Sequence, residues 1–147
     1  MRILALDYGT HRIGVAISDE TCTIAQPIET ISASPFSDFL QRLKELVREK
    51  EISLIIVGMP RKLDGSYGAA TIKVQEFVNA IKEDIPIPVK TWDERLTTVQ
   101  AQRSMISLGV KRKARKQKID QTAAAIILQS YLDSLTKEGS PDGECKN

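Results

Sequence analysis

The chain has 147 residues and a net charge of +2, which suits one folded domain with a proper core. No apolar run approaches the ~18 residues that a membrane span needs, and the N-terminus lacks the pattern of a signal peptide. The two cysteines, Cys22 and Cys145, are not spaced as metal ligands. These features exclude a membrane-spanning protein and a cysteine-based metal site, and we expect a soluble, cytoplasmic protein.

Positive charge is concentrated in one window of the chain. Six of the eight residues from 111 to 118, KRKARKQK, are Lys or Arg, and none is acidic. Such a segment on a mildly acidic body favours contact with a polyanion, although a solvated loop would have the same composition. The polar residues 137–147 are expected to be disordered, which leaves residues 1–136 as a single domain.

The predicted elements begin with two apolar runs at 2–6 and 13–18 and a third strand at 23–31, where Pro27 favours an edge position or a bulge. Short connections between these runs favour an antiparallel meander. Strands and helices then alternate, so we expect an α/β fold with a mixed five-stranded sheet, three antiparallel strands followed by two parallel ones, and helices on both faces. The later elements are helices at 35–50, 68–82, 97–108 and 119–136, and strands at 53–58 and 89–92.

Acidic residues stand at the ends of three predicted elements. Asp7 ends the first strand on the face of Ile3 and Ala5, the pair Asp93-Glu94 ends the fifth strand, and Asp120 lies in the first turn of the last helix. Each alone has an ordinary explanation, such as a turn, a surface acid or a favourable helix terminus. Together they indicate oxygen ligands for Mg²⁺ or Mn²⁺. Two such ions roughly 3.5–4 Å apart can support phosphodiester hydrolysis.

Four blocks of sequence resemble a known family across nearly the whole chain, to about residue 135. They are LALDYGTHRIGVAISD, IIVGMPRKLDGS, WDERLTT and KIDQTAAAIILQSYL. They occur in the order typical of the YqgF family, also called RuvX, which has the RNase H-like fold. The resemblance implies a nuclease. Members are described as Holliday junction resolvases and, in bacteria, as nucleases that mature the 5′ end of the small-subunit ribosomal RNA precursor.

The resemblance also implies the catalytic residues. Asp7, Glu94 and Asp120 should bind the metal ions, while Asp93 is a further candidate because the family motif leaves open which acid of the pair points inward. If the fifth strand alternates regularly, the two acids face opposite sides, and we expect Glu94 to be the ligand.

Basic residues near the expected site are candidates for contacts with nucleic acid. Arg12 and Arg61 lie in loops close to the acids, whereas Trp92 is expected to pack against the core rather than to stack on a base. The candidates in the basic window are Lys111, Arg112, Lys113, Arg115 and Lys116.

Two other kinds of protein, an ATPase and a binding module without catalysis, fit the sequence less well than a nuclease does. The turn Asp7-Tyr8-Gly9-Thr10 also fits the phosphate loop of actin-type and sugar-kinase ATPases, but those enclose their nucleotide with two such domains. A binding module without catalysis would leave three acids that repel phosphate. Among nuclease substrates we favour an RNA precursor over a branched DNA junction. Resolution of a junction requires a stable dimer, and no dimer surface is evident, so a monomer or a weak homodimer is expected.

Overall fold

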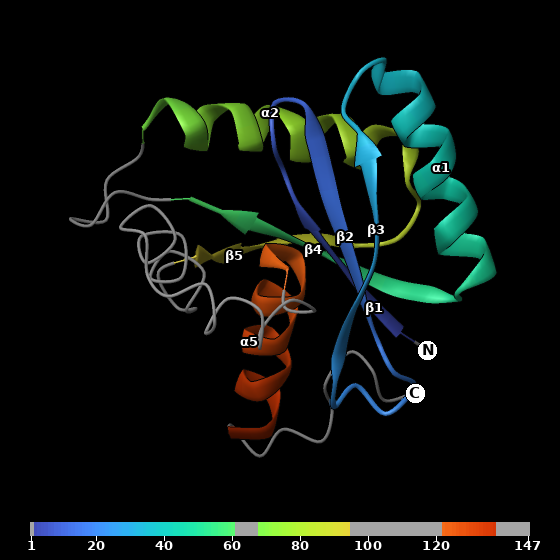
Figure 1. The fold of residues 1–147 in the computed structure, drawn as a ribbon, viewed down its shortest axis with the longest axis vertical. Coiled ribbons are helices and arrows are strands. Elements are labelled where there is room, and N and C mark those ends of the chain that lie inside the picture. Colours follow the sequence, from blue (N-terminus) through green and yellow to red (C-terminus); the bar gives the residue numbers. More distant parts are fainter. Residues whose placement is uncertain (1, 61–67, 95–121, 138–147) are drawn as a thin grey trace, which may run out of the picture.

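The structure is a computed structural model that describes residues 2–60, 68–94 and 122–137. In this part of the chain a sheet lies between α1 and α2 on one face and α5 on the other (Figure 1). The strands are β1 (Arg2–Asp7), β2 (Arg12–Ser18), β3 (Ala25–Ser32), β4 (Ile52–Met59) and β5 (Val89–Asp93), and the helices are α1 (Phe36–Glu49), α2 (Ala69–Asp84) and α5 (Ala123–Lys137).

The sheet confirms the predicted fold class. Its strand order is β3-β2-β1-β4-β5, with β1 antiparallel to β2, β2 antiparallel to β3, and both β1 and β5 parallel to β4. β3 is an edge strand, and its register with β2 shifts beside Pro27, so this residue has both the edge position and the irregularity that the sequence predicts.

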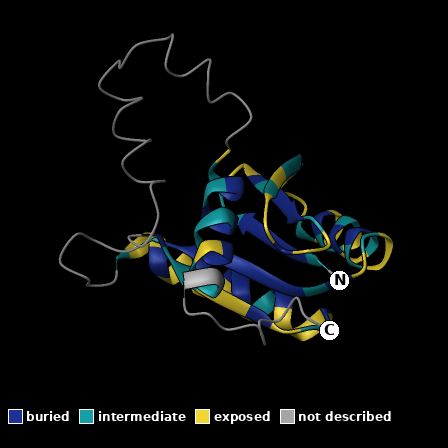
Figure 2. Cartoon of the chain, turned by 90° about the horizontal axis from the view of Figure 1, so that it is seen from below, coloured by how far each residue is buried: buried dark blue, intermediate teal, exposed yellow. Residues whose placement is uncertain are grey.

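The two central strands are buried on both faces, and their side chains divide between two apolar clusters. Leu4 and Leu6 of β1 pack with α1 and α2, whereas Ile3 and Ala5 pack with α5. This division is the period-two alternation predicted for β1. Buried residues are accordingly concentrated in the strands and on the inner sides of the helices (Figure 2).

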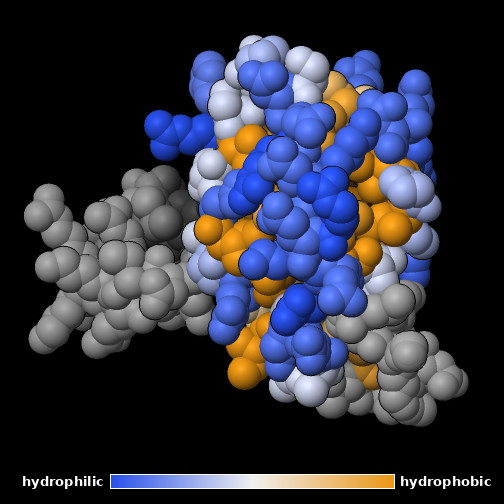
Figure 3. All heavy atoms as spheres, turned by 90° about the vertical axis from the view of Figure 1, so that its right-hand side faces the viewer, coloured by the Kyte–Doolittle hydropathy of each residue, from blue (hydrophilic) through white to orange (hydrophobic). Residues whose placement is uncertain are grey.

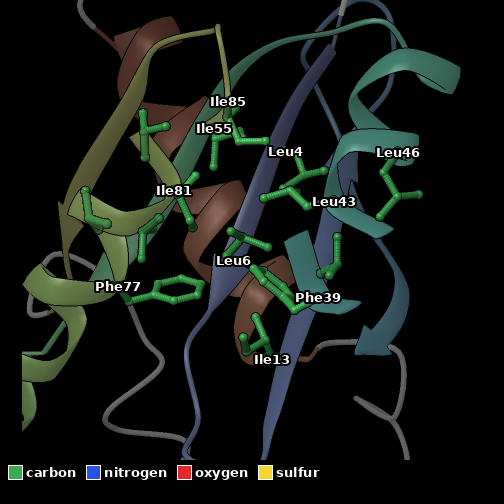
Figure 4. Packing of buried hydrophobic residues seen from close by; sticks show 14 of the residues in the cluster. Leu4, Leu6, Ile13, Phe39, Leu43, Leu46, Ile55, Phe77, Ile81 and Ile85 are labelled. Atoms are coloured by element: carbon green, nitrogen blue, oxygen red, sulfur yellow. The ribbon is translucent and has the colours of Figure 1, made fainter. Parts of the chain in front are cut away.

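The cluster beneath α1 and α2 is built from large side chains. The rings of Phe39 and Phe77 lie 5.5 Å apart between their centroids, and Tyr8 lies 4.7 Å from Phe77. Figure 4 shows Leu6 and Ile13 beside these rings. Opposite this cluster, α5 contacts β1, β2 and β3 and, to a smaller extent, β4.

The start of α5 differs from its predicted position. α5 begins at Ala123 rather than at residue 119, and Thr122 precedes the helix with its hydroxyl oxygen accepting a hydrogen bond from the Ala125 amide. A Thr side chain that bonds the third amide of a helix is an N-terminal cap, and this cap sets the start of α5. The predicted helix start at residue 119 is therefore wrong, and Asp120 lies outside the described residues.

Several predictions concern residues outside the described ranges. They are the helix at 97–108, the basic window at 111–118 and the tail after residue 137. The division into a domain of residues 1–136 and a tail stays a prediction. Among the described helices, none has the length and apolar character to cross a membrane.

Candidate active site

Asp7 is the last residue of β1 and lies on the α5 face of the sheet. It is directly opposite Gly14 of β2, and a side chain added to Gly14 would come 3.8 Å from the Asp7 Cβ and 3.7 Å from the Ala124 Cβ of α5. Asp7 is half-buried and continues the series of Ile3 and Ala5. The first turn of α5 therefore packs beside this carboxylate.

Glu94 directly follows β5 and is buried, with only 6% of its surface exposed. Its carboxylate lies above Gly58 of β4, because a Cβ added there would be 3.1 Å from Glu94 Oε2 and 2.5 Å from Ile127 Cδ1. Since Ile127 belongs to α5, Glu94 also faces α5. Any side chain at position 58 would occupy the space between this carboxylate and the helix.

The sheet register brings Asp7 and Glu94 to one edge. Leu6 is opposite Val57 in the last pair of the ladder between β1 and β4, and Asp7 and Gly58 are the next residues of these strands. β4 alone separates β1 from β5, which puts the backbones of these two strands about 10 Å apart. The carboxylates at the ends of β1 and β5, the two strands that flank β4, thus lie on either side of a position without a side chain.

The two neighbouring acids of β5 face opposite sides of the sheet. Asp93 is opposite Met59 in the register, and Met59 belongs to the apolar cluster beneath α1 and α2. Alternation therefore places Asp93 with that face, while Glu94 contacts the α5 side. The structure separates the two acids in the way that regular alternation predicts.

Trp92 connects β5 to α5. Its indole N–H donates a 3.1 Å hydrogen bond to Ser130 Oγ, and its ring meets Tyr131 edge-on with the centroids 5.2 Å apart. Trp92 is partly buried against the α5 cluster, which confirms the prediction that it packs against the core. Glu94 directly follows β5, and the first turn of α5 lies beside Asp7, so this contact joins two elements of the site.

Arg12 is the one predicted nucleic-acid contact that the described residues include. It is exposed, begins β2, and is two residues before Gly14, so alternation places it on the α5 face beyond Asp7. Asp120, Arg61 and the predicted contacts in the basic window lie outside the described residues. Within the described ranges, no group of three His, Cys, Asp or Glu residues is arranged to hold a metal ion.

Gly58 and Ile127 were missed by the sequence reasoning. A glycine inside or at the end of an apolar strand often marks a close approach of another group, and Gly58 ends the run SLIIVG. Because a glycine is equally typical of a strand end, the sequence pattern alone does not separate the two roles. Ile127 gives no comparable signal because its contact depends on where α5 crosses the sheet.

Comparisons with known proteins give a consistent family match. The family model described as "RuvX: Holliday junction resolvase" matches residues 1–134. A protein of Thermoanaerobacter pseudethanolicus is 48% identical over 135 residues, which cover 91% of this chain and 97% of the relative. A protein of Halothermothrix orenii is 47% identical over 137 residues, covering 93% and 98%. Both relatives carry the name "Putative pre-16S rRNA nuclease".

Solved structures show a related fold. RuvC of T. thermophilus in complex with a Holliday junction substrate aligns with a TM-score of 0.53 and 17% identity, over 95% of this chain and 97% of that one. Another structure of the Thermus thermophilus RuvC gives the same TM-score with 13% identity. At this identity the likeness concerns the fold alone, and it agrees with the RNase H-like fold that the sequence predicts.

Proposed function

Since this chain belongs to the RuvX family, we propose that it is a metal-dependent nuclease that hydrolyses phosphodiester bonds and processes the 5′ end of precursor 16S rRNA. The names of the relatives support the RNA substrate, and the match across residues 1–134 favours a nuclease over the ATPase and the binding module. A cytoplasmic location is part of this proposal.

The observation that carries the proposal is the placement of Asp7 and buried Glu94 on one face with Gly58 between their strands. The space above Gly58 would be filled by any Cβ, and its neighbours include a carboxylate oxygen. Both features fit a small, hard cation with oxygen ligands.

The residues proposed to hold the cation or cations are Asp7, Glu94 and Asp120. Asp120 lies outside the described residues, and its role rests on the family resemblance; Thr122, two residues later in the sequence, caps the helix whose Ala124 packs beside Gly14. Asp93 stays a less favoured candidate because it is on the opposite face.

The chemistry divides between the cation and the protein. Mg²⁺ or Mn²⁺, with two ions proposed, supplies Lewis acidity toward a phosphate oxygen and the attacking water. Asp7 and Glu94 would fix the position of that charge, and Ile127 of α5 lies with the Glu94 carboxylate over Gly58. Arg12 is proposed to contact a substrate phosphate. The residues proposed to bind more distant phosphates are Arg61, Lys111, Arg112, Lys113, Arg115 and Lys116.

The experiment compares wild type with Asp7→Asn and Glu94→Gln on a precursor rRNA leader, with Mg²⁺, with Mn²⁺ and with chelator. Each variant should lose cleavage by roughly a hundredfold or more, since a charged ligand becomes neutral while its volume is retained. Wild type should lose cleavage in chelator. Asp93→Asn is the neighbouring comparison and should retain most of the activity, because the structure places it on the other face.

Equal cleavage by wild type and Asp7→Asn would contradict the metal site. If Asp93→Asn abolished cleavage and Glu94→Gln retained it, Asp93 rather than Glu94 would be the metal ligand.

Resolution of four-way DNA junctions is the second candidate function, and the description of the family model favours it. A four-way junction and a single-stranded RNA should therefore be assayed in parallel with the leader. Symmetric cleavage of the junction alone, by a chain that light scattering shows to be dimeric, would replace the RNA substrate with a branched DNA.

A further inference from the structure

We propose that Trp92 is a positioning residue, which fixes the Glu94 carboxylate relative to Asp7 through its contact with Ser130 and Tyr131 of α5. The inference rests on the proposed function, because the group that Trp92 positions is a proposed cation ligand. Trp92 itself touches neither the cation nor the substrate in this proposal.

The first step concerns the end of β5. In the part of the chain that the structure describes, β5 pairs with β4 alone, and its last paired residue is Asp93. Glu94 lies one residue beyond that ladder, so the strand pairing does not reach it. Because Glu94 also faces α5, the contacts between β5 and α5 contribute to its position.

The second step is a match in spacing between β5 and α5. Ile127 lies beside the Glu94 carboxylate, and Ser130 and Tyr131 contact Trp92. Residues three and four apart on a helix share a face and are separated along its axis by about 4.5–6 Å. Two residues along a strand span about 6.6 Å. The two contacts therefore fit side by side, and the indole hydrogen bond holds β5 and α5 in this register.

The third step is that α5 is itself held at the opposite edge of the sheet. Gln129 donates from Nε2 to the Thr23 carbonyl oxygen at 3.0 Å, and its Oε1 accepts from the Ala25 amide at 2.9 Å. α5 is thus tied to β3 by one residue and to β5 by the next two. Because α5 begins beside Gly14 and Asp7, the contact of Trp92 relates one acid to the other.

The test measures Mn²⁺ binding by titration calorimetry without substrate, for wild type, Trp92→Phe, Ser130→Ala and the double variant. Phenylalanine keeps an aromatic ring against Tyr131 but removes the indole N–H. Each single variant should weaken Mn²⁺ binding by roughly threefold to tenfold, which is the effect of one hydrogen bond. The double variant should lose no more than a single one, because both changes remove the same interaction.

Gln129→Ala is the matched control, because it removes the two hydrogen bonds that join the same helix to the other edge of the sheet, together with one to Asp133 within the helix. It should lower the melting temperature as Ser130→Ala does, yet change Mn²⁺ affinity by less than about twofold. Cleavage should show the same division, with a higher Mg²⁺ requirement in Trp92→Phe and Ser130→Ala and near-normal rates at saturating Mg²⁺.

Unchanged Mn²⁺ affinity in Trp92→Phe and Ser130→Ala would overturn the inference while the proposed function stands. An equal loss of affinity in Gln129→Ala would also overturn it, because the effect would then reflect general loosening of α5. If the wild-type protein bound no Mn²⁺, both the proposed function and this inference would be wrong.

Discussion

The two faces of the sheet use the same strands for different purposes. On the face of α1 and α2, large apolar side chains such as Leu6, Phe39 and Phe77 fill the space and are almost fully buried. On the face of α5, the residues near the end of β1 are small, and two carboxylates lie among them. The large side chains on the face of α1 and α2 therefore stabilise the fold, whereas the small side chains at the end of β1 on the face of α5 leave space for charged groups.

The difference shows how a single strand can serve both purposes. In β1, Leu6 and Asp7 are adjacent in sequence but belong to opposite faces. Substitutions at these two positions should have separable effects, because a defect in the large-residue core changes stability and a defect at Asp7 changes chemistry. Substitutions on each face therefore test whether stability and cleavage change independently.

The largest expected effect is that of Leu6→Ala. Leu6 is completely buried beside Phe39 and Ile13 (Figure 4). Its truncation should lower the free energy of unfolding by about 2–5 kcal/mol, since the transfer energy of the methyl groups is lost and a cavity remains. Denaturant unfolding measures the loss. Cleavage per folded molecule should stay close to wild type, because Leu6 points away from the acids.

Leu6→Met is the control, since it keeps the volume and should cost less than about 1.5 kcal/mol. A fall in cleavage by Leu6→Ala at a temperature where it is fully folded would break the proposed separation of the two faces.

A smaller effect is expected for Gly58→Ala on the α5 face. The added Cβ would come 2.5 Å from Ile127 Cδ1 and 3.1 Å from Glu94 Oε2, so both side chains must shift. Overpacking of this kind costs about 1–3 kcal/mol of stability. Mn²⁺ binding should weaken as well, because the displaced group includes the carboxylate. Thermal unfolding and calorimetry on the same sample measure the two effects.

A second substitution separates these effects. Gly58→Ala combined with Ile127→Val should recover part of the stability, since the shorter side chain yields space, while Mn²⁺ binding stays weak. Gly14→Ala is the comparison, because its Cβ meets Ala124 and Asp7 only at 3.7 and 3.8 Å, which is ordinary contact. Equal losses for Gly14→Ala and Gly58→Ala would show that the close approach at Gly58 is not the cause.

Much of this arrangement could be predicted from the sequence because it depends on local periodicity. Alternation assigned Asp7 to the face of Ile3 and Ala5, and Pro27 indicated an edge. For the pair Asp93-Glu94, alternation along a short strand predicted that the two acids face opposite sides, and the structure places them so. In each case the sequence pattern that supports the prediction lies within a few residues of the residue whose position is predicted.

The features that could not be predicted depend on contacts between distant segments. Trp92 and Ser130 are 38 residues apart, and no pattern in either segment specifies their hydrogen bond. The start of α5 was missed because Thr122 caps it with its own side chain, while the preceding residues carry no glycine or proline to interrupt the helical pattern. Propensity alone therefore extended the predicted helix beyond its cap.

The smallest expected effect lies at the rim of the α1 face and should change stability but not cleavage. Arg42 of α1 makes two hydrogen bonds to Glu29 of β3, at 2.9 and 2.8 Å, on a surface where hydrophilic side chains predominate (Figure 3). The bonds from Arg42 hold the pKa of Glu29 below its ordinary value of 4.5, against the opposing effect of burial.

Because the folded pKa of Glu29 is the lower one, the unfolded chain binds more protons as the pH falls through this range. The stabilisation is thus fully present above about pH 4.5 and is lost as the pH falls through the folded pKa. Glu29→Gln should reduce the free energy of unfolding at pH 7 by no more than about 1 kcal/mol, as for other partly exposed pairs. The difference from wild type should shrink below pH 4.5. A change in cleavage by Glu29→Gln at pH 7 would mean that the rim of the α1 face is coupled to the acids across the sheet, and the division between the two faces would fail.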